Sequence, residues 1–488
     1  MDAVTNVPAP GNEPVLTYAP GSPERAALRQ RLTELAGEPL ELTMTIGDEQ
    51  RMGGGERFDV VQPHRHAAVL GTAANATHAD AEEAVACAKA AAPAWRDLSF
   101  DDRAAVFLRA ADLLSGPWRQ TLNAATMLGQ SKTAYQAEID SACELIDFWR
   151  WNVHFAREIV SAQPVSSPGV WNRSDHRPLE GFVYAVTPFN FTAIAGNLPT
   201  APALMGNTVV WKPAPTQQFA AHFVMRLLEA AGLPPGVISM VTGDGAAVSD
   251  VALADRDLAG IHFTGSTAVF QMLWRRVGEN IASYRGYPRI VGETGGKDFV
   301  VAHPSADLDV LRTALVRGAF EFQGQKCSAA SRAYVPRSVW ARLRDDLVGV
   351  TESLSMGDVT DFSNFMGAVI DRKSFSKLSG VIDRVDDDPA LLKALPEALR
   401  LRMRGVLVDT SEHHARFTGR VVAQLGAHNP QNLFPEMAVD KAGSMWNLIR
   451  WVSPRTIKET FVPPRDYRYP FLVAEDSDGA PGGPGGSR

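Results

Sequence analysis

Short apolar runs alternate with amphipathic stretches over the middle of the chain. The apolar runs are rich in β-branched and aromatic residues and lie at 181–188, 207–213, 236–243, 259–265 and 289–296. Each gap is about one helix long. Strands that alternate with helices in this way indicate βαβ units and a parallel sheet. Because near-continuous apolar strands are typical of a sheet covered on both faces, the pattern predicts a doubly wound α/β domain.

The preceding part of the chain is mainly helical in pattern. Apolar positions recur at helical spacing in 24–37, 81–95, 103–116 and 134–160. His78-Ala79-Asp80 and Phe100-Asp101-Asp102 supply polar caps for the second and third of these helices. Two short strands are expected on either side of the Gly53-Gly54-Gly55 turn.

A second α/β pattern follows the apolar runs. Over 307–354 a helix leads into a Gly-containing loop that carries Cys327, and a strand and a further helix come next. Residues 446–472 are aromatic and punctuated by proline, which suits an extended segment that lies on another surface. The Gly- and Pro-rich end of the chain is expected to be a flexible tail.

Composition narrows the class of protein. The chain has 488 residues, 45% of them hydrophobic and 21% charged, with a formal net charge of −7. Such a chain can bury a large core. The mildly acidic balance, with no cluster of Lys and Arg, argues against a nucleic-acid interface. No apolar run approaches the roughly 18 residues that would span a membrane.

The three cysteines, Cys87, Cys143 and Cys327, are far apart in sequence. Such a sparse set argues against a disulfide scaffold and against a zinc site with C-x-x-C spacing, and no metal site is expected. The N-terminus has neither a basic start nor an apolar run, so no secretory signal is expected. We therefore expect a soluble, cytoplasmic protein.

Polar residues follow three of the predicted strands, at the edge where ligands bind in such folds. Asn190 can donate its amide N–H to a developing oxyanion, or it can simply form a turn. Lys212 can bond ribose hydroxyls or a phosphate, or it can be a solvated lysine at a strand end. Gly265-Ser266-Thr267 opens a helix whose N–H groups suit a pyrophosphate, or it is an ordinary N-cap.

Two further residues can carry the reaction itself. Glu293 lies among glycines just past a strand and can act as a general base if burial raises its pKa, or it is a solvated turn residue. Cys327 lies among Gly, Gln and Lys, whereas Cys87 and Cys143 lie in apolar helical patterns. A neighbouring cation or helix N-terminus would raise the thiolate fraction of Cys327.

Together these motifs resemble those of the aldehyde dehydrogenase superfamily. The motifs F-N-F, W-K-P, F-T-G-S, E-T-G-G-K and G-Q-K-C-S begin, in this order, at Phe189, Trp211, Phe263, Glu293 and Gly324. Within the superfamily, the chain is similar to the L-glutamate γ-semialdehyde (Δ1-pyrroline-5-carboxylate) dehydrogenases over 13–385 and 439–470. The resemblance implies NAD-dependent oxidation of that aldehyde to L-glutamate, in proline degradation.

The resemblance also implies a role for each candidate residue. Cys327 attacks the aldehyde, Asn190 and the Cys327 N–H hold the oxyanion, and Glu293 activates the water that hydrolyses the thioester. The residues implied to line the NAD cofactor are Thr187, Lys212, Gly265, Ser266, Thr267, Ala268 and Val269. Those implied to lie near the substrate are Ser328 and Glu144.

The implied architecture has a Rossmann-like NAD-binding part and a catalytic part. The expected divisions are an N-terminal arm and helix (1–40), an NAD-binding domain (41–295), an α/β catalytic domain (296–445), an oligomerisation segment (446–475) and a tail (476–488). In relatives the segment near the C-terminus crosses to a neighbouring subunit, which implies a homodimer or a higher homo-oligomer.

Two motifs of the family are missing from the chain. One is E-x-F-G-P, whose Glu binds the nicotinamide ribose, and the other is a Gly-rich loop that anchors the substrate's α-carboxylate. The chain is expected to be shorter than its relatives between about 385 and 438. The intact Cys327, Glu293 and Asn190 favour an active enzyme, whereas the missing loops favour a weakly active or non-catalytic relative that binds NAD and oligomerises. Cofactor-independent thioester hydrolysis by Cys327 is a third alternative.

Overall fold

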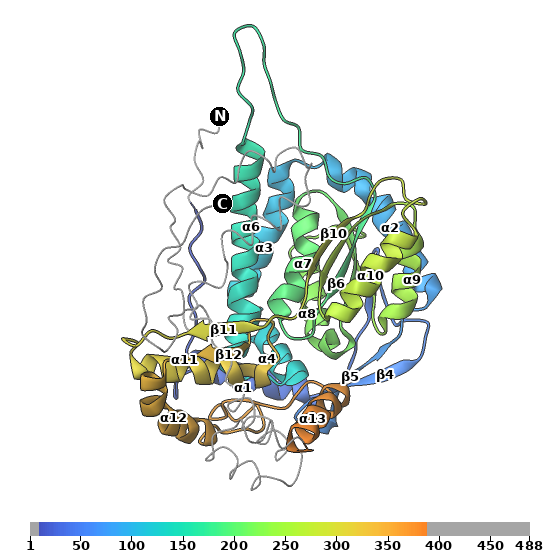
Figure 1. Ribbon diagram of the computed structural model, residues 1–488. Helices are drawn as coiled ribbons and strands as arrows, with labels where there is room; N and C mark the ends of the chain where they lie inside the picture. Colours follow the sequence, from blue (N-terminus) through green and yellow to red (C-terminus); the bar gives the residue numbers. More distant parts are fainter. Residues whose placement is uncertain (1–8, 388–488) are drawn as a thin grey trace.

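A seven-stranded sheet lies at the centre of the protein (Figure 1). The structure is a computed structural model that describes residues 9–387, with side chains described to residue 380. In sheet order the strands are β10 (Arg289–Glu293), β9 (Leu258–Thr264), β6 (Phe182–Thr187), β7 (Thr208–Pro213), β8 (Ile238–Met240), β2 (Met44–Ile46) and β3 (Glu49–Arg51). The first five are parallel, and β2 and β3 add an antiparallel edge.

The order of the parallel strands reverses beside β6. The chain moves outward from β6 through β7 to β8, and then returns to the other side of β6 to form β9 and β10. The α/β class and the doubly wound parallel sheet are therefore confirmed. Such a reversal places the carboxyl ends of β6 and β9 around a crevice, which is where ligands bind in open α/β sheets.

Helices cover both faces of this sheet, as Figure 1 shows. Alternate residues of β6 point to opposite sides, with Val183 and Ala185 in one core and Phe182 and Tyr184 in the other. The helices of the first face are α3 (Phe100–Ser115), α4 (Arg119–Gln130), α6 (Glu144–Ser161), α7 (Thr192–Leu204) and α8 (Gln218–Ala230). Those of the second face are α2 (His78–Asp97), α9 (Gly245–Ala254) and α10 (Thr267–Glu279).

Strands lie on both sides of Gly53-Gly54-Gly55, as expected, although two strands, β2 and β3, precede the glycines where one was expected. The glycines separate two sheets, because β3 belongs to the central sheet while β4 (Arg57–Gln62) pairs with β5 (Arg65–Ala74) and lies in a sheet with β1 (Leu40–Glu41). The chain packs tightly here, since a Cβ at Gly53 would lie 2.5 Å from the Asn75 carbonyl oxygen. The helix caps also shift by one residue, to Thr77 for α2 and Ser99 for α3.

A buried ion network fastens the N-terminal arm, the residues before α1 (Pro23–Gly37), to the helical layer. Glu138 begins a π-helical turn (Glu138–Cys143) between α5 (Ala134–Ala137) and α6, and it is fully buried. Its carboxylate pairs with Arg119 and accepts a hydrogen bond from the Tyr18 hydroxyl at 2.8 Å. Arg119 also pairs with Glu13 of the arm.

We expect Arg119→Met to lower the free energy of unfolding by about 3–5 kcal/mol, because it leaves the Glu138 carboxylate buried without its cation. Urea denaturation measures this loss. Arg96→Met is the control, since Arg96 pairs with Asp97 in solvent and exposed pairs contribute little. A loss for Arg119→Met no larger than that of the control would contradict the structural importance of the network.

A smaller unit follows the central sheet and carries Cys327. Parallel strands β11 (Asp298–Val301) and β12 (Ala330–Tyr334) pack with α11 (Leu308–Phe320) and α12 (Arg337–Glu352) around a separate core. Two 3₁₀ turns (Pro215–Gln217 and Glu321–Gly324) and α13 (Arg372–Asp387) complete the described elements. No helix among residues 9–387 is both long and apolar enough to cross a membrane.

Several sequence-based expectations lie outside the described residues. They are the shortening between 385 and 438, apart from its first residues, the oligomerisation segment at 446–475 and the tail at 476–488. The boundaries between the NAD-binding and catalytic parts stay a prediction.

Candidate active site

The predicted cofactor residues gather at one edge of the central sheet. Thr187, Lys212 and Thr264 lie at the carboxyl ends of β6, β7 and β9, and Glu293 ends β10 in register with Thr264. Val186 pairs with Lys212 on one side and with Phe263 on the other, so the strands end level with one another. Residues more than a hundred positions apart thus meet at the point where the strand order reverses.

Lys212 is the cation at this edge. It is only 5% exposed, and burial lowers the pKa of its ammonium to about 8, although Asp244 opposes this shift. Gly245 begins α9 beside it, and a Cβ there would lie 3.7 Å from Lys212 Nζ. A buried ammonium beside a glycine fits a sugar or phosphate that approaches closely.

The segment Gly265–Val269 forms the start of α10. Ser266 is the N-cap, and its hydroxyl accepts from the Val269 N–H at 3.4 Å, while the Gly265 N–H donates to the Glu293 carbonyl oxygen at 3.1 Å. Within this segment, Ser266, Thr267 and Ala268 occupy the turn whose N–H groups lack acceptors inside the helix. The donor set therefore fits a pyrophosphate. Thr187 is buried, and its hydroxyl accepts from the Trp211 indole N–H at 2.9 Å.

The loop that carries Cys327 has an unusual backbone. Phe322, Gln323 and Gly324 follow one another with φ of 50°, 56° and 67°, in the left-handed region. Two of them are not glycine, and such residues keep this conformation only when surrounding contacts hold them. The Gln323 side chain supplies one contact, since it donates to the Ala368 carbonyl oxygen at 2.5 Å.

Cys327 lies against the segment that carries Glu293. A Cβ at Gly296 would fall 2.3 Å from the Cys327 carbonyl oxygen, so this position of the E-T-G-G-K motif requires glycine. The half-buried thiol is hydrogen-bonded to the Glu293 carboxylate. Burial, with the nearby charges of Glu293 and Glu144, raises the pKa of Cys327 to about 12, whereas the Ser328 N–H opposes this shift. Glu293 itself is exposed among the described residues, so water reaches it.

We expect the alkylation of Cys327 by iodoacetamide to rise about tenfold per pH unit from pH 7 to pH 10, because the thiolate is the nucleophile and the thiol pKa lies above this range. Glu293→Gln removes a negative charge and therefore lowers the thiol pKa, so alkylation at pH 8 becomes faster. Mass spectrometry of the Cys327 peptide measures both rates. Glu279→Gln, at the exposed end of α10, is the control. A plateau below pH 9 in the wild type would contradict the raised pKa.

Asn190 joins the two halves of the site. Its side-chain Nδ2 donates to the Gln325 carbonyl oxygen at 2.9 Å, two residues before the nucleophile. One N–H of the amide is therefore held by the Cys327 loop, and the other has no acceptor among the residues that the structure describes. This is the geometry that an oxyanion donor needs, because a fixed amide requires no reorganisation when charge develops.

Glu144 and Ser328 lie in the same cluster. Burial and the charge of Asp140 raise the pKa of Glu144 to about 8, so the carboxyl is largely protonated at neutral pH. Its Oε2 is buried and has no hydrogen-bond partner among the described residues. A protonated carboxyl beside the thiol can donate to a bound substrate.

Some residues of the site were not predicted from the sequence. Lys132, Asp140 and Lys326 form buried ion pairs directly beneath the nucleophile loop. A signal for Asp140 was present in the sequence, since acidic residues such as Glu138 and Glu144 recur in an otherwise apolar helical stretch. Charged residues in such a stretch are usually buried and paired with an opposite charge.

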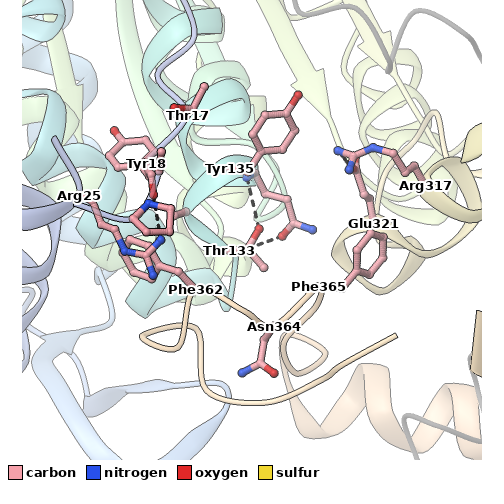
Figure 2. A pocket seen from close by; sticks show the side chains of 14 residues that line it. Thr17, Tyr18, Arg25, Thr133, Tyr135, Arg317, Glu321, Phe362, Asn364 and Phe365 are labelled. Carbon is pink, nitrogen blue, oxygen red and sulfur yellow. Dashed lines mark hydrogen bonds and ion pairs between the residues drawn. The ribbon is translucent and has the colours of Figure 1, made fainter. Parts of the chain in front are cut away.

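A separate cavity of about 280 Å³, with Glu321 in its lining, is shown in Figure 2. It is lined by residues of the N-terminal arm, of α1, of α5 with its N-cap residue, and of α11 with the turn that follows it, and by Phe362, Asn364 and Phe365. In the cavity lining, Arg317 lies over the Tyr135 ring and forms an ion pair with Glu321. None of the site residues predicted from the sequence lines this cavity.

Both the sequence and the structure of the chain are similar to those of known proteins. The sequence model of the aldehyde dehydrogenase family matches residues 51–394, which is well over half of the chain. The chain belongs to the aldehyde dehydrogenase family. Its fold is similar to the crystal structure of the Δ-pyrroline-5-carboxylate dehydrogenase from Mycobacterium tuberculosis bound with NAD. The two sequences are 52% identical and the two structures superpose with a TM-score of 0.80. The match covers 97% of this chain and 100% of the Mycobacterium tuberculosis chain.

Curated relatives of the chain carry the same type of name as this solved structure. A Δ1-pyrroline-5-carboxylate dehydrogenase from Agaricus bisporus is 46% identical over 390 residues, 79% of this chain and 71% of the relative. A mitochondrial one from Dictyostelium discoideum is 37% identical over 548 positions, 96% of this chain and 97% of the relative. The alignment with the Dictyostelium relative is 60 positions longer than the 488 residues of this aldehyde dehydrogenase (548 − 488). The relative therefore has residues that this chain lacks. The placement of the corresponding gaps within 385–438 stays a prediction.

Proposed function

We propose that this aldehyde dehydrogenase oxidises L-glutamate γ-semialdehyde, the open form of Δ1-pyrroline-5-carboxylate, to L-glutamate with NAD as the hydride acceptor, a step of proline degradation. The supporting observation is the meeting of Cys327, Glu293 and Asn190 at the carboxyl edge of the sheet. The 52% identity to a structure of a Δ-pyrroline-5-carboxylate dehydrogenase bound with NAD supports the substrate and the cofactor.

The chain's own residues supply the acid–base and nucleophilic chemistry. Glu293 takes the proton of the Cys327 thiol, and Cys327 Sγ forms a bond to the aldehyde carbon. The remaining N–H of Asn190 and the Cys327 backbone N–H stabilise the oxyanion. NAD, when bound, would supply the acceptor for the hydride of this carbon, and Cys327 would then hold the acyl group as a thioester.

The exposed Glu293 carboxyl releases the thiol proton to solvent and then acts a second time. It removes a proton from a water molecule that attacks the thioester carbon, and the carbon–sulfur bond breaks to release L-glutamate and the thiol. The net reaction converts the aldehyde, NAD⁺ and water into the carboxylate, NADH and two protons. Exposure of Glu293 supports this role, because the same carboxylate must contact the thiol in one step and water in the next.

The cofactor would be held by the sheet edge. Lys212 would bond the adenosine ribose, the start of α10, Gly265 to Val269, would hold the pyrophosphate, and Thr187 would line the site. Glu144 and Ser328 would lie beside the substrate. The alternative is a relative that binds NAD and oligomerises with little turnover. The absence from the sequence of the E-x-F-G-P motif and of the carboxylate-anchoring loop favours it.

Oligomerisation and location form part of the proposal. A homodimer or higher oligomer is supported by residues 162–180, which project beyond α6 (Figure 1) and expose Val165, Val170 and Trp171 at 90%, 56% and 78%. The division at residues 295 and 445 into NAD-binding, catalytic and oligomerisation parts belongs to the same proposal. A cytoplasmic location is supported by the three free thiols, although several relatives are named as mitochondrial.

Aldehyde selectivity tests the proposed substrate. We expect kcat/KM for L-glutamate γ-semialdehyde to exceed that for propanal, which lacks the α-amino acid group, by about 100-fold or more, because polar groups placed for a substrate reject an analogue that leaves them unpaired. NADH absorbance measures both rates. Equal values for the two aldehydes would contradict this substrate, and NAD binding without NADH formation would favour the alternative.

A further inference from the structure

Buried charges lie beneath the nucleophile loop, and the proposed reaction leaves them without a role. Asp140 Oδ2 accepts a hydrogen bond from Lys132 Nζ at 2.6 Å and lies 3.2 Å from Lys326 Nζ. The Lys132 side chain is fully buried, and those of Asp140 and Lys326 are 5% and 8% exposed. Charges this deep are costly unless they are paired, so one aspartate joins two lysines from different parts of the chain.

Lys132 contacts both loops that carry reacting groups. Its Nζ lies 4.3 Å from the centre of the Phe191 ring and 4.4 Å from the centre of the Phe322 ring. Phe191 directly follows Asn190, and Phe322 belongs to the left-handed turn before Cys327. A desolvated ammonium attracts aromatic rings on either side, so Lys132 draws the two loops together.

Lys326 holds the other end of the nucleophile loop. It directly precedes Cys327, and its Nζ reaches Asp140 and, at 3.4 Å, Glu321 Oε2. Glu321 is in turn paired with Arg317 of α11. The left-handed residues lie between Glu321 and Lys326, so these ion pairs hold both ends of the strained segment.

We propose that Lys132, Asp140 and Lys326 form a clamp that sets the position of Cys327 relative to Asn190, with Asp140 and Lys326 as positioning residues. The proposal rests on the proposed function, in which the thiol and the Asn190 amide must meet at one carbonyl group. Small displacements of aligned groups cost large factors in rate. Neither Asp140 nor Lys326 touches the reacting atoms in this arrangement.

A double-mutant cycle with Asp140→Asn and Lys326→Gln tests the clamp by two measurements. The first is hydrogen–deuterium exchange of the peptide over 321–329, which needs neither NAD nor aldehyde. We expect each variant to speed this exchange about tenfold, because the contacts that close the loop are lost. The effect of the double variant should be smaller than the two single effects combined, since both substitutions break the contact between Asp140 and Lys326, while the Lys132 and Glu321 pairs are each lost in one variant only.

The second measurement is turnover. We expect each variant to lower kcat about tenfold with an unchanged Kd for NAD, and Lys326→Arg, which keeps the charge, to recover most of the rate. The matched control is Lys89→Gln, because Lys89 pairs with Asp255 and Asp257 away from the site. The melting temperature of the Lys89→Gln variant also measures how far the loss of a Lys–Asp pair lowers the stability of the fold by itself.

The outcomes separate the clamp from the proposed function. Wild-type exchange over 321–329 in either variant, or additive effects in the double variant, would overturn the clamp. A lower kcat in Lys89→Gln matching that in Lys326→Gln would also overturn it. If the wild type forms no NADH, the proposed function fails, and the exchange cycle alone decides the clamp.

Discussion

Cys327→Ala is expected to abolish NADH formation, with a fall in kcat of about 10⁴-fold or more, because removal of a covalent nucleophile leaves only binding and oxyanion stabilisation. The Kd for NAD should stay within about twofold of the wild type, since Cys327 lies beyond the edge that holds Lys212 and α10. Steady-state absorbance measures the first quantity and calorimetry the second.

The other cysteines provide the controls. Cys87 is half-buried on α2, and Cys143 is buried beside Glu138 in the helical layer. Cys87→Ala should therefore retain nearly full turnover. Comparable loss in Cys87→Ala and Cys327→Ala would indicate that the effect arises from the fold, and residual turnover in Cys327→Ala above about one-hundredth of the wild-type rate would contradict covalent catalysis by this thiol.

Glu293→Gln is expected to separate the two halves of the reaction. The amide cannot accept the proton of the attacking water, so thioester hydrolysis slows by about 10²–10⁴-fold. Because this substitution also lowers the pKa of Cys327, attack on the aldehyde remains possible. The expected result is a burst of one NADH per subunit followed by slow turnover, with the acyl group retained on the Cys327 peptide.

Stopped-flow absorbance records the burst, and mass spectrometry of the quenched enzyme identifies the acylated residue. Glu279→Gln should show wild-type turnover, since that residue lies at the exposed end of α10. Slow NADH formation without a burst would show that the lowered thiol pKa does not replace Glu293 as the acceptor of the thiol proton. A wild-type rate would contradict its role as the base.

The central sheet was predictable from the sequence because its strands are buried on both faces. β6, β7 and β10 each lie within a predicted apolar run, β9 begins one residue before its run, and the carboxyl ends of these strands carry the polar residues that the motifs singled out. β5 was missed, since its Ala-rich sequence lacks both a continuous apolar run and clear alternation. Strands on either side of Gly53–Gly55 were predictable, but local turn signals do not say to which sheet each flanking strand belongs.

The interior of the site was harder to predict. Asp140 and Lys326 are 186 positions apart (326 − 140), and no local pattern reports a contact at such a separation. The same holds for the left-handed backbone at Phe322 and Gln323, which contacts such as the bond from Gln323 to Ala368 hold in place. Motifs identify residues that react, whereas the groups that position them emerge only from the packed structure.

Product stoichiometry tests the central claim most directly. The full chain is incubated with NAD and L-glutamate γ-semialdehyde, and NADH and L-glutamate are quantified in the same sample. The proposed function predicts equal amounts of the two products over many turnovers, and neither product in the Cys327→Ala variant. NAD binding without either product would contradict an active dehydrogenase and favour the non-catalytic relative.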